Sequence, residues 1–351
     1  MKFIIRDAVL GDSDKLIKLT GLTPMKGTIG LKIDRAPDFF NLLKLSESFI
    51  ALVAENIDKE IIGSFVATKN QLYIMQKVTT AYYLRDLKVH PGYKGNTVAY
   101  LLVKKMYERL KALRADILYC TSAGGNNAVM PFFEGRAGIP AFVNVGNFNV
   151  YQLLPKQNAK GNALLSISNK PEIQFLSSEY AKRYSFYSAN IQQDISDNGI
   201  NFSQVKNETI TAALNAFDTA AYKQNIVTSH SFAIGLLLSL LRFVKFFLPI
   251  SPLPKKNEPL KILYARYYAY TKEKGNDLII LLNKLRAYAY EKQYHFVSIA
   301  SDEKDEHTNK IIKPLSKFVF RSALMVTSLQ NNKELMQQIC DGVKFEDYAL
   351  V

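Results

Sequence analysis

The sequence contains little cysteine, and this narrows the kinds of site that it can hold. Cys120 and Cys340 are its 2 cysteines, and neither belongs to a C-x-x-C pair or stands beside clustered histidines. We therefore expect neither a disulfide framework nor a metal site. Cys120 ends the apolar run from Asp116, which is typical of a small buried strand residue.

A secretory leader and an uninterrupted membrane-spanning run are also missing. The chain opens with a short apolar stretch that runs directly into charge. The segment Ser231 to Pro249 has the look of a membrane span, but Arg242 and Lys245 interrupt it and its apolar part is too short to cross a bilayer. It could be a buried element, a cavity wall or a membrane-surface helix. We expect a cytoplasmic protein and do not expect membrane contact.

Acidic residues are outnumbered, and the formal net charge is +14. Such an excess favours anionic partners: nucleic acid, a membrane surface or a polyphosphate cofactor. The lysines are scattered and form no long block, which is typical of solvated surfaces. We therefore do not expect nucleic acid as a partner.

The length predicts two domains, because 351 residues exceed one ordinary core. In the first half, strands, a helix over 98–110 and a further strand follow one another, which predicts a mixed α/β sheet. Pro37 to Leu45 also predicts a helix. The polar stretch Pro155 to Gly161 predicts a linker. The predicted divisions are 1–155, a linker at 156–163, and 164–351.

The second half repeats features of the first at a constant offset. Lys94-Gly95-Asn96 precedes two leucines, and Lys274-Gly275-Asn276 precedes two leucines in the same way. The strand at 82–89 corresponds to 261–270, and the strand at 116–121 to 296–301. The shared order of strand, turn, helix and strand predicts an internal duplication.

The segment Asp86 to Ala99 carries the chemistry, because it predicts a strand, a glycine turn and a helix start. The first amides of a helix lack partners within it and lie at the positive end of its dipole, so a diphosphate can dock there. Gly95 removes an obstruction, Ala99 keeps the next turn slim and Lys94 adds a cation. An ordinary βα turn can hold the same glycine.

The run Leu87 to Ala99 resembles the pyrophosphate-binding segment of the GNAT acetyltransferase superfamily. In that family an apolar strand leads to Arg or Gln, two residues, Gly, one residue, and Gly or Ala. Here Lys94 takes the place of Arg or Gln and keeps the charge. Thr97 takes the place of the glycine, so it keeps the amide but crowds the loop.

Asn126 to Glu134 resembles a second segment of that family, which begins with Asn and ends in Leu-Tyr-Glu. The resemblance implies that Asn126 bonds the pantetheine arm or its neighbourhood; alternatively, Asn126 only caps a short helix. The family's Tyr, a frequent acid for the departing CoA thiolate, falls on Phe133, which has no proton to donate. Another group or solvent then protonates the thiolate, or this half has lost catalysis.

The resemblance covers residues 2 to 153 and implies an α/β (α+β) protein with two tandem GNAT-like domains. Each would be a mixed, mostly antiparallel twisted sheet with helices on both faces. The first would bind acetyl-CoA, with pantetheine pairing to the strand as an extra partner and the Val89 amide meeting the oxyanion. The implied cofactor contacts are Leu87, Lys88, Val89, Lys94, Gly95, Asn96, Thr97, Val98, Ala99, Asn126 and Phe133.

Catalysis needs a base that deprotonates an ammonium group before attack. Asp86 lies on the strand beside the expected thioester, although a structural salt bridge is the alternative. His90 is a second candidate base, but it precedes Pro91 in the turn. Tyr119 and Cys120 are candidate acids, of which strand alternation turns only one toward the cleft.

The second domain is interpreted as a degenerate copy. It has Asp277 where the first has Thr97, and a carboxylate there would repel a diphosphate. No second Asn-to-Phe-Glu segment occurs. We expect this half to pack on the first and to help shape the acceptor pocket.

The sequence thus predicts an N-acyltransferase that moves acetyl from acetyl-CoA to an amine. Phe133 leaves open a non-catalytic acyl-CoA sensor or scaffold. The charge and the many tyrosines leave a nucleic-acid-binding protein as a third reading. The sequence names neither the acceptor nor the oligomeric state.

Overall fold

The computed structural model describes residues 2–24, 29–95, 97–123, 133–135, 138–157, 175–176, 179, 183–196, 199–230, 255–271 and 275–351. Three features of interest lie outside these residues: the predicted cofactor contacts Asn96 and Asn126, most of the predicted linker, and the segment Ser231 to Pro249. No helix within the described residues is both long and apolar enough to cross a bilayer.

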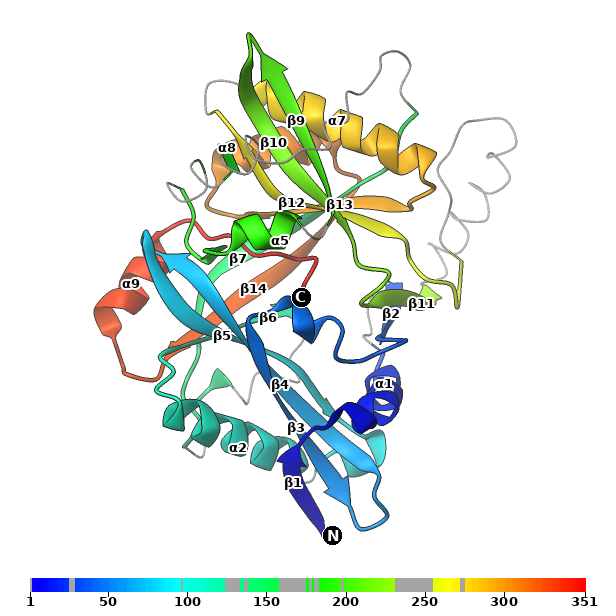
Figure 1. The fold of residues 1–351 in the computed structure, drawn as a ribbon, viewed down its shortest axis with the longest axis vertical. Helices are drawn as coiled ribbons and strands as arrows, with labels where there is room; N and C mark the ends of the chain where they lie inside the picture. The colour runs from blue at the N-terminus through cyan, green and yellow to red at the C-terminus, as the bar shows by residue number, and fades with distance from the viewer. Residues whose placement is uncertain are drawn as a thin grey trace.

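The described part of the chain forms one large mixed sheet that runs through the whole molecule (Figure 1). Its strand order is β1-β3-β4-β5-β6-β14-β7-β13-β12-β10-β9, and β8 pairs with β4. The strands of the first half are β1 (Phe3–Asp7), β3 (Ser48–Asn56), β4 (Ile61–Ile74), β5 (Lys77–Val89), β6 (Ile117–Ala123) and β7 (Val143–Leu153). Those of the second half are β8 (Tyr187–Ser188), β9 (Ile200–Lys206), β10 (Thr209–Asp218), β12 (Ile262–Tyr270), β13 (Phe296–Asp302) and β14 (Phe318–Ser328).

A separate small sheet pairs β2 (Ile29–Asp34) with β11 (Gln224–His230), so that it joins the two halves. The helices are α1 (Ser13–Gly21), α2 (Val98–Ala112), α5 (Ile191–Ser196), α7 (Gly275–Glu291), α8 (Glu306–Ile312) and α9 (Lys333–Asp341). Short 3-10 turns are η1 (Leu10–Asp12), η2 (Leu43–Leu45), η3 (Pro91–Tyr93) and η7 (Lys313–Leu315).

The strand order reads alike from its two ends, which supports the duplication. β3-β4-β5-β6 at one end matches β9-β10-β12-β13 at the other. β5 and β6 are parallel and α2 connects them; β12 and β13 are parallel and α7 connects them. In the middle the last strands are exchanged, because β14 pairs with β6 and β7 pairs with β13.

A bulge is duplicated as well. Between β4 and β5 the register shifts so that Asp86 and Leu87 have no partner, and between β10 and β12 it shifts at Tyr267 and Tyr268. The first residue of each pair has a positive φ, 53° at Asp86 and 47° at Tyr267. A bulge of this kind bends a strand and re-aims its groups.

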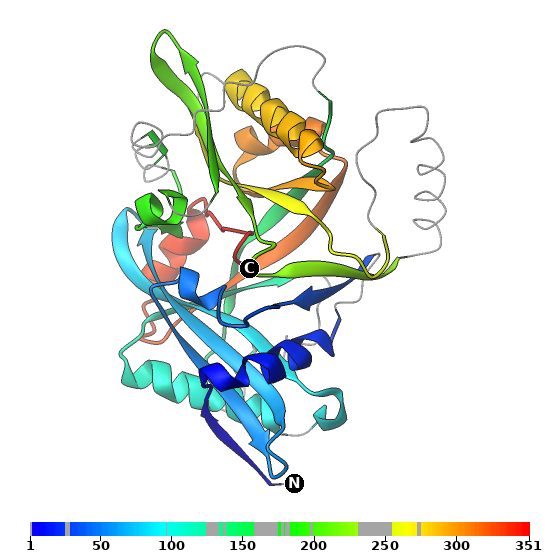
Figure 2. The same ribbon diagram turned by 45° about the vertical axis from the view of Figure 1, so that its right-hand side comes forward.

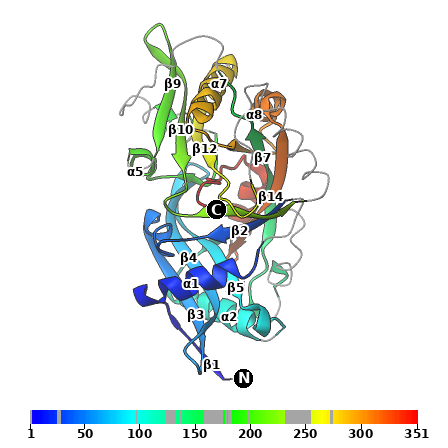
Figure 3. The same cartoon turned by 90° about the vertical axis from the view of Figure 1, so that its right-hand side faces the viewer.

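Helices cover both faces of the first half. Leu102 and Met106 of α2 pack on a cluster that includes Leu52, whereas Leu16 of α1 packs on one that includes Val53. Because successive strand residues point to opposite faces, α1 and α2 lie on opposite sides of β3 to β5, as Figure 3 shows. The predicted mixed fold with helices on both faces is confirmed.

The helix predicted over 37–45 is wrong, because this stretch forms turns and the short η2. Phe39, Phe40, Leu42 and Leu43 are all buried, so the apolar spacing that suggested a helix packs these side chains into the core from a turn. The Asp38 carboxylate accepts the Phe40 amide at 2.9 Å, which favours a turn.

Gly63 of β4 sets the approach of α2 to the sheet. A Cβ atom at this position would lie 2.8 Å from Val98 Cγ1 and 2.9 Å from Leu102 Cδ1. Both of these side chains are fully buried in the first turns of α2. The glycine therefore allows the beginning of α2 to rest directly on β4, beside the predicted phosphate loop.

Candidate active site

Strands β5 and β6 separate from each other in the middle of the sheet. Their parallel pairing joins Ala81 to Ile117 and ends where Tyr83 lies opposite Tyr119. Both strands then continue, β5 to Val89 and β6 to Ala123. The result is a V-shaped gap whose apex lies at the two tyrosines.

Backbone amides of β5 face this gap. The His90 amide donates to the Ile62 carbonyl of β4 at 2.8 Å. Because amides alternate along a strand, those of Leu87 and Val89 point the opposite way, toward the gap. The Ser64 hydroxyl donates to the Asp86 carbonyl at 3.0 Å and holds the bulge in place. The side chains of Leu87 and Val89 pack under α2, which leaves their amides as the groups that a bound ligand meets.

The predicted phosphate loop comes directly after β5 in the chain. Lys94 is exposed, and Gly95 has a φ of 83°, which a side chain would strain. Among the described residues, no atom lies within 4 Å of a Cβ atom built at Gly95, so none of them obstructs the approach to the loop. Thr97 precedes α2, and its side chain makes no capping hydrogen bond. The first turn of α2, with Val98 and Ala99, therefore presents its amides next to a lysine.

Asp86 is held in a buried ion pair. Arg35 Nη2 donates to both oxygens of its carboxylate, at 2.8 and 3.0 Å, and Arg85 Nε lies 3.3 Å away. The side chains of Arg35 and Asp86 are only 2% and 6% exposed. Burial acts to raise the pKa of Asp86, but Arg35, Arg85 and other nearby cations outweigh it and hold that pKa below its usual value. A carboxylate so paired is a poor proton acceptor, so this geometry favours the salt-bridge alternative over the predicted base.

A cavity of about 540 Å³ opens on the face of β4 to β6 opposite α2, and we call it the acceptor-face cavity. The first half contributes Lys44, Leu45, Ser46, Glu47, Thr68, Asn70, Gln71, Leu72, Tyr83, Arg85 and Tyr119. The second half contributes Phe186, Ser188, Asn190, Asp194, Tyr267, Phe345, Glu346, Asp347 and Leu350. The chain end that supplies the last four lies between the two halves of the sheet (Figures 1 and 2).

Two tyrosines form the floor of this cavity at the apex of the gap. The Tyr83 hydroxyl lies 2.7 Å from Thr121 Oγ1 of β6, and Asn70 Nδ2 donates to the Tyr119 hydroxyl at 3.1 Å. The ring centroids of Tyr83 and Tyr119 are 5.1 Å apart, and Phe186 packs 5.3 Å from Tyr119. Burial raises the pKa of Tyr119 well above its usual value, so its hydroxyl keeps its proton. Cys120 does not line the cavity.

Glu346 is the functional candidate that the sequence did not reveal. Burial, and then the neighbouring Asp347, raise its pKa to about 8, while Arg85 acts to lower it. Its charge also acts on Tyr83 and Tyr119, so it lies near the apex of the gap. No local motif marks Glu346, because more than two hundred residues separate it from the tyrosines that it faces.

Phe133 packs against Phe142, with ring centroids 5.4 Å apart, and belongs to the rim of the core beneath the gap. It has no hydroxyl at the position where the family that the sequence resembles has Tyr. Within the described ranges, no three His, Cys, Asp or Glu side chains gather as metal ligands would.

The equivalent gap of the second half is closed. β12 and β13 also part after Ala265 and Ile299, but the Tyr268 hydroxyl crosses the space and donates to the Ala300 carbonyl of β13 at 2.8 Å. At the start of α7, Asp277 is completely buried and its carboxylate accepts from Lys206 Nζ at 2.5 Å. A protein carboxylate thus occupies the end of α7 where the first half leaves an open loop.

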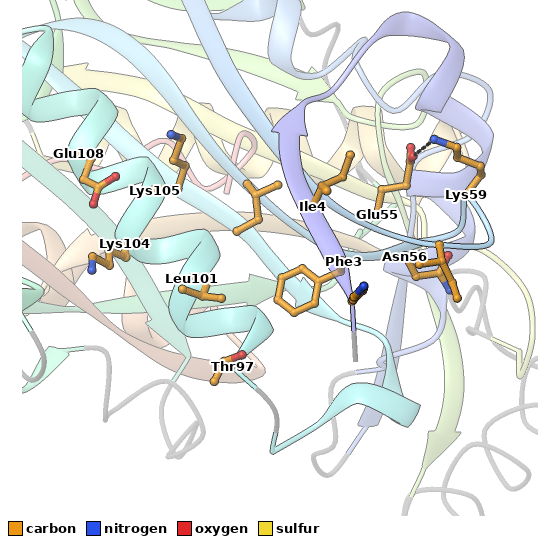
Figure 4. A pocket seen from close by; sticks show the side chains of 13 residues that line it. Phe3, Ile4, Glu55, Asn56, Lys59, Thr97, Leu101, Lys104, Lys105 and Glu108 are labelled. Atoms are coloured by element: carbon orange, nitrogen blue, oxygen red, sulfur yellow. Dashed lines mark ion pairs between the residues drawn. The ribbon is translucent and has the colours of Figure 1, made fainter.

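A second cavity, of about 990 Å³, lies between β1 and the beginning of α2 (Figure 4). Lys104, Lys105 and Glu108 project from α2 there, and Glu55 pairs with Lys59 at 3.2 Å across its far wall. β3, β4 and β5 separate β1 from β6, so this larger cavity lies at the sheet edge, away from the gap.

Residues 27–139, which include the gap and the phosphate loop, match the model of the acetyltransferase (GNAT) family. No curated protein sequence matches the chain. Among solved structures it is similar to the N-myristoyltransferase of Saccharomyces cerevisiae with bound myristoyl-CoA, with 11% identity and a TM-score of 0.62 over 93% of this chain and 82% of that one. It is also similar to a GCN5-related N-acetyltransferase from Sphaerobacter thermophilus, with 11% identity and a TM-score of 0.56 over 93% and 95%. The predicted resemblance is confirmed: residues 27–139 match the acetyltransferase (GNAT) family, and 93% of the chain has the fold of these solved structures.

Proposed function

We propose that this protein transfers an acetyl group from acetyl-CoA to a primary amine. The observation that carries the proposal is the gap between β5 and β6, which has the Gly95 loop at its mouth and the acceptor-face cavity at its apex. Acetyl-CoA could enter the gap from one side and place its thioester at the apex. An acceptor could then reach the thioester from the other side. The cytoplasmic location remains a prediction, as do the domain boundaries at 155 and 163.

In the proposed complex, the diphosphate lies on Lys94, the Gly95 loop and the first amides of α2. The pantetheine arm extends along Leu87 to Val89 and pairs with their inward-facing amides. One of these amides, most directly that of Val89, meets the oxygen of the thioester as it becomes an oxyanion. The contacts proposed for Asn126 and Asn96 fall on residues outside the described ranges.

The amine nitrogen attacks the carbonyl carbon, the C–S bond breaks, and CoA leaves as a thiolate while an amide forms. The thiolate needs a proton that Phe133 cannot give. We assign this role to Tyr119, whose hydroxyl lies at the apex of the gap and is oriented by Asn70.

The apex favours a short acyl group. The Tyr83 hydroxyl bridges to Thr121 across the two strands, and the rings of Tyr83 and Tyr119 fill the space beyond the expected thioester. Most of the side chains that line the acceptor-face cavity are charged or carry hydroxyl or amide groups, and a long alkyl chain would displace the water that hydrates them. This supports acetyl rather than a long acyl group as the transferred unit.

The test is thermal unfolding with and without excess acetyl-CoA, since a ligand that binds only the folded state raises the midpoint. We expect a rise in the wild type that Gly95→Glu abolishes, and Gly95→Ala separates backbone strain from blockage of the loop. Gly11→Glu adds the same charge at an open glycine away from the site. No rise in the wild type would contradict the proposal.

A non-catalytic acyl-CoA sensor is the second candidate, and the packing of Phe133 where the family has Tyr favours it. Release of free CoA thiol in the presence of amines separates the two functions. A midpoint that rises without any amine-dependent thiol release would support the sensor.

A further inference from the structure

We infer that the acceptor-face cavity binds a small, polar primary amine, and that Glu346 takes up the proton which its ammonium group must lose. This inference rests on the proposed transfer reaction and names its acceptor class and its base. Neither the family match nor the phosphate loop indicates either of them.

The size and lining of the cavity indicate the acceptor class. A volume of about 540 Å³ is that of a small-molecule site. Hydroxyl and amide side chains line it from both halves: Ser46, Thr68, Asn70, Gln71, Ser188 and Asn190. An alkyl amine would remove water from these groups without replacing its hydrogen bonds, which is costly. A small amine that carries hydroxyl, amide or further amino groups fits this lining.

The charged groups of the lining indicate where the ammonium lies. Most are already paired: Glu47 with Lys69 at 2.6 Å, Asp347 with Arg266 at 2.8 Å, Lys44 with Asp38 at 2.8 Å and Arg85 with Asp86 at 3.3 Å, while Asp194 accepts from the Tyr267 hydroxyl at 2.9 Å. Within the described part of the chain, the Glu346 carboxyl has no ion pair or hydrogen bond. An ammonium group is the partner that it lacks.

The surroundings of Glu346 suit a proton acceptor. Tyr83 and Arg85 of β5, Tyr119 and Cys120 of β6, and Asp347 and Tyr348 of its own segment are near enough for their charges to interact with that of Glu346. Its pKa of about 8 lies close to neutral pH, where a general base is most effective. A cationic substrate lowers this pKa and leaves the carboxylate ionised in the complex.

The proton balance is then complete. The ionised Glu346 accepts one proton from the ammonium group, which frees the lone pair of the amine for attack on the thioester. The tetrahedral intermediate collapses with loss of the CoA thiolate, which Tyr119 protonates. Glu346 releases this proton to solvent through the open cavity and then accepts the second proton, which the attacking nitrogen loses as the amide forms, while Tyr119 is reprotonated from the same solvent.

The acceptor class is tested by CoA thiol release from acetyl-CoA with a panel of amines: spermidine, glucosamine, free lysine, octylamine and a peptide with a free N-terminus. We expect turnover with one or more of the first three and little with the last two. Turnover confined to octylamine or the peptide would overturn the acceptor class and leave the transferase function standing. No turnover with any amine, although acetyl-CoA raises the midpoint, would refute the proposed transfer and this inference with it.

The base is tested with Glu346→Gln on the best amine of that panel. We expect kcat/KM to fall by about 10²- to 10⁴-fold with an unchanged acetyl-CoA midpoint shift, and Glu346→Asp to restore part of the rate. In the wild type kcat/KM rises with pH through an apparent pKa near 8, and this inflection disappears in Glu346→Gln. Asp341→Asn, an exposed carboxylate of α9 outside the cavity, should match the wild type. A Glu346→Gln enzyme that keeps the rate and the pH profile would show that Glu346 is not the base.

Discussion

Replacing Asp86 tests whether its carboxylate has a structural or a catalytic role. Asp86 lies at a bulge with a φ of 53°, a conformation that Asn tolerates better than Ala. Asp86→Asn therefore keeps the shape and the backbone and removes mainly the charge. What remains is Arg35, which is 2% exposed and whose Nε and Nη1 atoms already lack hydrogen-bond partners among the described residues.

The expected loss follows from that burial. Removing one partner of a buried ion pair costs about 3–5 kcal/mol, because an uncompensated charge stays behind. The remaining amide oxygen of Asn still accepts one hydrogen bond from Arg35, so we expect about 3 kcal/mol for Asp86→Asn. Ala loses that bond and strains the bulge, so Asp86→Ala should cost about 1 kcal/mol more. Burial already lowers the pKa of Arg35 to about 10, which shows that its charge is barely compensated.

Urea unfolding of the wild type and the two variants measures these free energies. Asp7→Ala is the control, because Asp7 and Arg109 form an exposed pair, 3.2 Å apart, that should contribute less than about 1 kcal/mol. A loss for Asp86→Asn no larger than that of the control would refute the reasoning. An Asp86→Asn protein of wild-type stability that fails to turn over acetyl-CoA would instead restore Asp86 as the base.

Three further predictions concern the rest of the molecule. Gly63→Ala should push α2 from β4 and weaken the midpoint shift by acetyl-CoA, whereas Gly11→Ala, with open space around it, should not. The raised pKa of Glu346 means that the native state binds the extra proton, so wild-type stability should fall as pH rises from about 5 to above 8. Glu346→Gln should reduce this loss of unfolding free energy by about 2 kcal/mol, a figure that allows for solvent in the cavity. Unfolding curves recorded at several pH values measure it. Residues 164–351 expressed alone should show no cooperative unfolding by circular dichroism, because β13 and β14 lose their partner β7; a cooperative transition would contradict this.

The sequence predicted the features that depend on the pattern of residues close together in the chain. The spacing of Val98, Leu101, Leu102, Met106 and Leu110 predicts a helix, and all of these except Leu101 are buried in α2, together with Val103. Gly95 predicts an unobstructed loop before the helix, and no described atom lies within 4 Å of a Cβ atom built there. The constant offset between the Lys-Gly-Asn triplets predicts two like units, and the strand order and both bulges bear this out.

The sequence did not predict contacts between residues that are far apart in the chain. The exchange of β7 and β14 depends on which edge of the sheet each strand meets, and every one of those strands has an ordinary apolar pattern. Asp86 was visible as a carboxylate on the right strand, but its partner Arg35 is 51 residues away and belongs to no motif. Glu346 stands in the stretch Phe345 to Tyr348, whose burial only the packing of the two halves decides.

The exchanged strands explain how one working site can depend on both copies. β14 enters the first half beside β6, and the chain that follows it, through α9, returns to the middle of the sheet and carries Glu346 to the apex of the gap. The second copy needs no open gap of its own, so Tyr268 and Asp277 can fill the positions that CoA would use. The closed gap of the second half and the wall that this half supplies to the acceptor-face cavity are therefore two results of the same arrangement. This arrangement permits a catalytic carboxylate on the second half, and the proposed reaction then requires none on the strand that we propose as the CoA-binding strand.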